Sequence, residues 1–409
     1  MNIRRVDETA GRASPIGSVA EVFVVFLQLG LTSFGGPIAH LGYFRDELVV
    51  RRRWLDEAGY ADLLALCQFL PGPASSQVGF SLGVLRGGGL LGGLAAWLGF
   101  TLPSAMILFA FAVGTAAFHG LLADGLLHGL KLVAVAVVAQ AVWGMFKSLT
   151  PDRERRFIAL GAVALVVLIG GSIGQLSAIA LGAIAGLRLC RAESPAPIGN
   201  LGFPVSHRRA TIALVLFVVL LVVPSLVVAL TGYRAAALFD AFYRAGAFVF
   251  GGGHVVLPLL QAQVVTPGWV SNEAFLAAYG FAQAIPGPLF TIATYLGAVM
   301  TTQPNGLLGA AIALVALFLP GLLLVYGMLP FWDTLRRRPM IQSGMRGANA
   351  AVVGVLAAAL YDPVGTSALL SPVDFVLALG GFLLLVVVKV PPWIVVALLA
   401  MLAALASWA

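Results

Sequence analysis

Charged residues are scarce in this chain. Only 10% of its 409 residues are Asp, Glu, Lys or Arg, whereas 60% are hydrophobic. A water-soluble domain carries about 25% charged residues, so this chain lacks the polar residues to cover a soluble surface. Apolar stretches such as 90–114 and 211–230 reach the ~20 residues that cross a bilayer core, and the short alternating segments of a β-barrel are missing. The composition predicts an all-α polytopic membrane protein.

Other features that the sequence lacks exclude further classes. Two cysteines, Cys67 and Cys190, are too few for a disulfide framework or a cysteine-based metal site. We find no Walker motif, no His-Glu-x-x-His, and no Ser-Lys or paired-Asp set, so we expect no cofactor, no metal and no enzymatic activity. The net charge is +7, but the basic residues are clustered. Such clustering indicates orientation in a membrane rather than a nucleic-acid partner.

An internal repeat organises the chain. The motif Pro-Gly-Pro occurs at residues 71–73 and again at 286–288, which is 215 residues later (286 − 71). Other landmarks recur in the same order with offsets of 215 to 217, as two copies of one unit require. They are Phe34-Gly35-Gly36 over Phe250-Gly251-Gly252, Trp54 over Trp269, Gln68 over Gln283, and Pro103 over Pro320.

The distribution of basic residues predicts that the two copies are inverted. Basic residues favour cytoplasmic loops. The first copy has Arg45, Arg51–Arg53 and Arg86 around its breaks, whereas the matching stretch 261–306 has no Lys or Arg. We therefore predict a first repeat (1–188), a cytoplasmic linker with a connecting transmembrane helix (189–232), and an inverted second repeat (233–409). The N-terminus and the linker 188–209 are placed in the cytoplasm, and about twelve to thirteen membrane segments are expected. Arg234 and Arg244 fit this orientation less well.

Each Pro-Gly-Pro lies between two segments that are too short to span a bilayer, so we predict broken, re-entrant helices. A half-helix that begins at membrane depth presents free N–H groups and a positive dipole end, which suit an anion. Matched breaks in two halves are the best sequence indication of a transport site. The candidate substrate-binding residues are Gly35, Gly36, Arg45, Gln68, Pro71, Gly72, Ser75, Ser76, Gln77, Arg86, Gly251, Gly252, Gln283, Pro286, Gly287 and Thr291.

Several of these residues have two open interpretations. Ser75, Ser76 and Thr291 either bind the anion or bond the carbonyl of their own preceding turn. Gln68 and Gln283 either bond the substrate or satisfy backbone groups at the break. Arg51–Arg53 are favoured as topology signals over a role in attracting anions. His40, Glu47 and His254 are candidates for proton coupling, but an ordinary hydrogen bond is favoured for the two histidines, and neutralisation of a nearby arginine is favoured for Glu47.

Long stretches of the sequence resemble the chromate ion transporter family. They are SFGGPIAHLGYFRDELVVRRRWL, ALCQFLPGPASSQVGFSLG and GFTLPSA in the first half, with FGGGHVVLPLL and FAQAIPGPLFTIATYLG in the second. The resemblance covers nearly the whole chain. It implies a two-domain inner-membrane transporter with antiparallel halves, which exports chromate, confers chromate resistance and uses the proton motive force.

The residues themselves leave several alternatives open. Sulfate shares the charge and shape of chromate, so a sulfate or other oxyanion carrier remains an alternative. A lipid scramblase, an intramembrane enzyme and a passive pore are alternatives from other classes. Expected partners are the lipid bilayer and protons, with a homodimer as a further possibility.

Overall fold

The computed structural model describes residues 17–34, 36–115, 121–190, 203–250, 256–332 and 338–406, and within these ranges every regular element is a helix. This confirms the all-α fold class. The first half contains α1 (Val19–Thr32), α2 (Gly36–Phe44), η1 (Arg45–Arg51), α3 (Glu57–Phe69), α4 (Ala74–Arg86), α5 (Leu90–Thr115), α6 (Leu121–Leu149), α7 (Arg153–Ile169) and α8 (Gly171–Leu189). The connecting helix is α9 (His207–Thr231). The second half contains α10 (Arg234–Ala247), α11 (Val256–Val264), α12 (Asn272–Ala284), η3 (Leu289–Thr291), α13 (Ile292–Val299), α14 (Gly306–Met328), η4 (Leu329–Phe331), α16 (Pro339–Ala359), η5 (Leu360–Gly365), α17 (Thr366–Ala368), α18 (Pro372–Leu383), η6 (Leu384–Val388) and α19 (Pro392–Ala406).

Local sequence signals fix where several helices begin. The side chains of Ser18, Asp56 and Ser271 accept a hydrogen bond from the backbone N–H three residues later, at the starts of α1, α3 and α12. Such caps satisfy N–H groups that the first turn of a helix leaves without a partner. The starts of α3 and α12 match each other in the two halves, so the same chemistry begins both helices before the Pro-Gly-Pro breaks.

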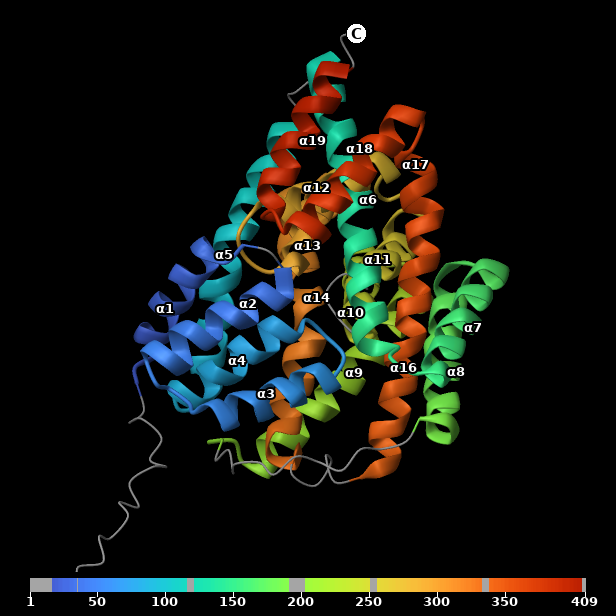
Figure 1. Ribbon diagram of the computed structural model, residues 1–409. Coiled ribbons are helices and arrows are strands. Elements are labelled where there is room, and N and C mark those ends of the chain that lie inside the picture. The colour runs from blue at the N-terminus through green and yellow to red at the C-terminus, as the bar shows by residue number, and fades with distance from the viewer. Residues whose placement is uncertain are drawn as a thin grey trace, which may run out of the picture.

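Matching helices of the two halves run in opposite directions. In Figure 1, α6 descends from the top of the view to the bottom, whereas its counterpart α16 rises from the bottom to the top. The last helices of each half are exchanged, because α19 packs against α6 and α8 packs against α16. The structure therefore shows the inverted arrangement of two homologous halves.

Five described helical stretches are long and apolar enough to cross a membrane, and five shorter apolar helices accompany them. The five long stretches are Leu90–Gly114, Gly125–Leu149, His207–Thr231, Gly306–Phe331 and Pro339–Ala368. Together with the short helices that flank the breaks, they are compatible with the predicted twelve to thirteen membrane segments. The chain is a multi-pass membrane protein.

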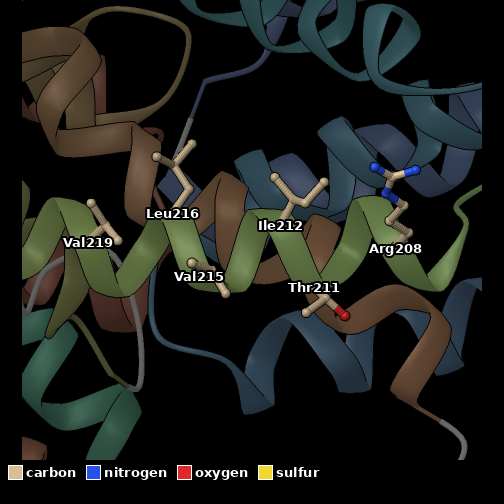
Figure 2. Close-up of a pocket in the computed structure, with 6 residues that line it drawn as sticks. All are labelled: Arg208, Thr211, Ile212, Val215, Leu216 and Val219. Carbon is tan, nitrogen blue, oxygen red and sulfur yellow. The ribbon is translucent and has the colours of Figure 1, made fainter.

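The connecting helix α9 faces the bilayer. Only 6% of its most apolar window is buried inside the protein. One exposed strip carries Ile212, Val215, Leu216 and Val219 and ends at Arg208 (Figure 2). An apolar face without protein neighbours is what a lipid-exposed helix presents.

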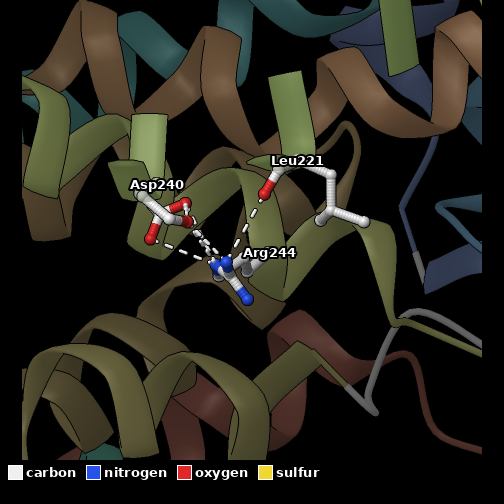
Figure 3. A network of polar contacts seen from close by, with 4 residues as sticks. Leu221, Asp240 and Arg244 are labelled. Atoms are coloured by element: carbon white, nitrogen blue, oxygen red, sulfur yellow. Dashed lines mark hydrogen bonds and ion pairs between the residues drawn. The ribbon is translucent and has the colours of Figure 1, made fainter. Parts of the chain in front are cut away.

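An ion pair within α10, hydrogen-bonded to α9, involves Arg244, one of the arginines that fit the predicted orientation poorly. Arg244 Nε donates to both carboxylate oxygens of Asp240, at 3.0 and 3.1 Å (Figure 3). The guanidinium also donates to the Leu221 carbonyl at 3.4 Å and to the Ser225 hydroxyl, which itself donates to Asp240 at 2.7 Å. Arg244 is therefore locally neutralised, and its position does not report the orientation of the membrane.

Candidate functional site

Both Pro-Gly-Pro motifs break their helices as predicted. Helix α3 ends at Phe69 and α4 begins at Ala74, while α12 ends at Ala284 and the next helical turn begins at Leu289. Proline removes a backbone donor at each break. The glycines adopt φ values of +127° at Gly72 and +104° at Gly287, which only glycine reaches without strain.

Each Pro-Gly-Pro turn is bonded to the other half. Gly72 N–H donates to the Val249 carbonyl at 2.7 Å, and Gly287 N–H donates to the Ser33 carbonyl at 3.0 Å. Ser33 and Val249 occupy matching places, each directly before the Phe of a Phe-Gly-Gly motif. The Pro-Gly-Pro turn of one half therefore docks on the Phe-Gly-Gly segment of the other, in a pair of hydrogen bonds related by pseudo-twofold symmetry.

A third pair of landmarks closes around the same turns. A Cβ atom added at Gly72 would lie 3.0 Å from Gly321 Cα, and one added at Gly287 would lie 2.6 Å from Ser104 Oγ. Gly321 and Ser104 directly follow Pro320 and Pro103, the matched prolines of α14 and α5. All the breaks predicted from the repeat thus meet at the boundary between the two halves.

Gln77 ties the first turn to the second half. Its Nε2 donates to the Pro71 carbonyl at 2.9 Å and to the Gly321 carbonyl at 3.0 Å. Gln77 is fully buried, and these bonds join the carbonyl at the first break to a carbonyl of α14 in the other half. Gln77 therefore lies at the candidate site, but its amide nitrogen is hydrogen-bonded to backbone carbonyls.

The matched glutamines before the breaks have different surroundings. Gln283 is buried, with its Nε2 lacking a hydrogen-bond partner among the described residues, whereas Gln68 is exposed. Their equivalence in the sequence therefore does not extend to equivalent positions in the site. Of the two, Gln283 is the buried one, and its side chain is hydrogen-bonded to that of Tyr279 while Nε2 keeps no described partner.

The hydroxyl groups after the breaks were predicted either to bind the anion or to bond their own turn, and they differ in their hydrogen bonds. Thr291 Oγ1 donates to the Pro288 carbonyl of its own turn at 2.6 Å. Ser76 is buried next to the start of α4, and its Oγ has no hydrogen-bond partner among the described residues. Ser75 is equally buried. No side chain caps the start of α4. Pro288 likewise provides no side-chain cap for η3, which runs directly into α13 and whose carbonyls accept the N–H of Ile292. The uncapped helix starts after the two breaks are therefore those of α4 and of η3.

Further buried polar atoms lie on the first half. Ser33 Oγ, Thr101 Oγ1 and His40 Nδ1 have no hydrogen-bond partner within the described part of the chain. His40 is 1% exposed and meets the ring of Phe100 edge-on at 5.2 Å between centroids. Ser33 and Thr101 are not among the residues predicted from the sequence, although Ser33 directly precedes Phe34 and Thr101 lies two residues before Pro103.

The candidate arginines and Glu47 lie in ion pairs near the surface. Arg45 binds Glu57 at 2.6 Å, and Arg86 binds Glu21 at 2.9 Å at the far end of α4. Arg86 is roughly 18 Å from the start of that helix, at about 1.5 Å per residue.

Glu47 accepts hydrogen bonds from Arg52 at 2.6 Å and from Arg51 at 3.0 Å. Partial burial alone would raise the pKa of Glu47, but these two arginines hold the pKa below its usual value. Glu47 is therefore ionised at neutral pH, which makes it a poor proton carrier.

Four predicted site residues, Gly35, Gly251, Gly252 and His254, lie outside the described residues. Gly36 is described and begins α2 with φ +78°. In the described part of the chain, no group of three or more His, Cys, Asp and Glu side chains is arranged to hold a metal ion.

Comparisons with known proteins agree with this architecture. The sequence pattern of the family described as "Chromate transporter" matches residues 20–187 and again residues 236–405. The chain is 30% identical over 374 residues to the "Chromate transport protein" of Pseudomonas aeruginosa, covering 88% of this chain and 84% of that protein. It is 29% identical over 373 residues to the "Probable chromate transport protein" of Synechococcus elongatus, covering 85% and 84% respectively.

A third relative is the "Chromate transport protein" of Cupriavidus metallidurans, which is 27% identical over 350 residues. The aligned region covers 85% of this chain and 83% of that relative. No solved structure matches the chain. The family pattern occurs twice, once in each inverted half, and together the two matches cover most of the sequence: the chain belongs to the chromate transporter family.

Proposed function

We propose that the protein is a secondary active transporter that exports chromate from the cytoplasm across the inner membrane. In this proposal the proton motive force drives export, and the anion binds between the starts of α4 and α13. The family and the names of the relatives support chromate as the substrate. The N-terminus and the segment 188–209 are placed on the cytoplasmic side because of their basic residues.

The observation that carries the proposal is a pair of Pro-Gly-Pro turns, each bonded to the other half and each followed by a helix start without a side-chain cap. A helix start offers N–H groups and about half a positive charge. Two such starts would offset about one charge of a dianion. The buried Ser76 hydroxyl adds a donor that no described protein group uses.

His40 is our proposed proton-coupling residue. It is buried on the first half, against Phe100 and within the segment that receives the second Pro-Gly-Pro turn. A proton on its ring would supply charge that the helix ends do not. Because the two halves are related by pseudo-twofold symmetry, rocking of one half against the other would expose the same site to either side in turn.

The test is chromate accumulation in inside-out membrane vesicles, in which export from the cytoplasm appears as uptake. We expect the wild-type protein to concentrate chromate against its gradient, and an uncoupler to abolish this accumulation. Ser76→Ala should raise the KM for chromate about tenfold, because a hydrogen bond to a charged ligand contributes about 1.5–3 kcal/mol. Ser148→Ala is the control, since Ser148 is exposed at the end of α6 and bonds its own helical turn.

The same assay separates the alternative carriers. Uptake of sulfate without chromate would retain the architecture and reject the substrate. Uptake that survives the uncoupler would reject the proton motive force as the energy source. If neither anion accumulates in folded protein, the proposed oxyanion export is wrong.

A further inference from the structure

The two halves are not chemically equivalent at their shared boundary. Corresponding positions around the Pro-Gly-Pro turns carry polar side chains in the first half and apolar ones in the second. The pairs are Ser33 and Val249, Gln77 and Ile292, Thr101 and Phe318, and Ser104 and Gly321. A site built on the backbone symmetry alone would have two equivalent sides, whereas these side chains make one side polar.

The polar residues of the first half gather around the second turn, at Gly287. Its N–H donates to the Ser33 carbonyl, and a Cβ added there would lie 2.6 Å from Ser104 Oγ and 3.5 Å from the Phe100 carbonyl. Ser104 in turn donates to the Thr101 carbonyl at 3.0 Å. Ser33, Ser104 and the turn of α5 that carries Thr101 therefore surround one glycine of the other half.

The hydroxyls in this group are buried without protein partners. Ser33 is 0% exposed and Thr101 is 2% exposed, and neither hydroxyl oxygen has a hydrogen-bond partner in the described residues. Burying an unpaired hydroxyl is unfavourable, so a buried pair of this kind indicates a ligand that uses it. Beside the group lies the start of the second half-helix, where Pro288 provides no side-chain cap.

The first turn has a different environment. There Gly72 packs against Gly321, and the Gln77 amide nitrogen donates hydrogen bonds to two backbone carbonyls. The counterparts of Ser33 and Thr101 in the second half are Val249 and Phe318, which have no hydrogen-bonding side chain. The first turn has the buried Ser76 hydroxyl of its own half-helix, but the other half provides no hydroxyl at these two positions.

We infer that the tetrahedral oxyanion is bound off the axis, at the Gly287 turn, with the hydroxyls of Ser33 and Thr101 from the first half as its side-chain ligands. This inference rests on the proposed function, since it names the residues that would recognise the anion in that site. It assigns the second half a backbone contribution, from the turn and the start of η3 and α13. The first half then determines which oxyanion is accepted.

The experiment is a direct measurement of binding, which does not depend on transport. Chromate and, separately, sulfate are titrated into the purified full-length protein in nanodiscs, with Ser33→Ala, Thr101→Val and Thr101→Ser beside the wild type. We expect Ser33→Ala and Thr101→Val each to weaken binding at least about tenfold, since each removes a hydrogen bond to a charged ligand. Thr101→Ser keeps the hydroxyl and should retain affinity to within about threefold.

Thr150→Val is the matched control. Thr150 is as buried as Thr101, but its hydroxyl donates to the Phe146 carbonyl at the end of α6, so this change should leave binding within about twofold. Equal weakening by Thr150→Val, full affinity in Thr101→Val, or no binding of either anion by the wild type would overturn the inference. If the wild type binds in the predicted manner but vesicles accumulate no chromate, the export proposal fails while the assignment of the ligands stands.

Discussion

Replacing Gly287 with alanine is expected to abolish chromate transport. The new Cβ would lie 2.6 Å from Ser104 Oγ and 2.9 Å from Ser104 Cβ, at a residue whose φ is +104°. Backbone strain of this kind costs about 1–3 kcal/mol, and overpacking costs a further ~1–3 kcal/mol. The substitution therefore destabilises the contact between the two halves, because Gly287 donates its N–H to the Ser33 carbonyl. Gly72→Ala should have the same effect at the first turn.

Gly42→Ala is the control for this prediction. Gly42 lies in α2, and nothing lies within 4 Å of an added Cβ. Alanine in a helix is favoured over glycine by about 1 kcal/mol, so transport and thermal stability should be retained. The readout is the initial rate of chromate uptake per folded protein, with folding checked by gel filtration in detergent. Wild-type uptake by Gly287→Ala would contradict the close contact between the halves.

Removing the carboxylate of Asp240 is expected to destabilise the protein strongly. Asp240→Asn leaves the guanidinium of Arg244 in α10 without its counter-charge. This guanidinium lies against Leu221 of the lipid-facing helix α9 (Figure 3). The side chains of Arg244 and Asp240 are 35% and 18% exposed, so the loss of the pair costs less than the about 3–5 kcal/mol of a fully buried one. An unpaired arginine inside a bilayer costs about 3 kcal/mol by insertion scales. We expect a lower midpoint of thermal unfolding in detergent and less protein inserted in the membrane.

The double change Asp240→Asn with Arg244→Gln separates charge from packing. It removes both charges and should recover most of the lost stability, because no uncompensated ion remains. The pair Arg45 and Glu57 provides the surface comparison. Both side chains are about half exposed, so Glu57→Gln should change stability by less than about 1 kcal/mol. A double variant as unstable as Asp240→Asn would show that shape, and not charge, makes Asp240 important.

The sequence was informative where local chemistry is decisive. A Pro-Gly-Pro triplet interrupts an apolar helix because both prolines lack an N–H donor, so the turns at Gly72 and Gly287 could be predicted from residue type, whereas α14 continues through the single pair Pro320-Gly321. The order of the landmarks and the basic loops predicted two inverted halves, and the opposite directions of α6 and α16 agree with this. Of the two arginines that fit the charge pattern less well, Arg244 is paired with Asp240, one helical turn away on the same helix.

Other features depend on contacts between the halves, which local patterns do not encode. Nothing near Gly72 in the sequence indicates that its N–H is bonded to Val249. For the same reason Gln77 was expected to bind substrate, whereas its amide nitrogen bonds Gly321 of the other half. Ser33 and Thr101 carry no local signal, because a hydroxyl within or at the end of an apolar helix is usually bonded to its own turn. Their burial without partners, which Ser76, Ser81 and Thr294 share among the described residues, is visible only in the structure.

The most direct test of the central claim is the position of chromium in chromate-bound crystals, measured by anomalous diffraction at the chromium edge. The account predicts one peak between the two halves, at the Gly287 turn beside Ser33 and the start of α13. A strongest peak among the ion-paired arginines Arg45, Arg51 and Arg86, with none between the halves, would contradict it.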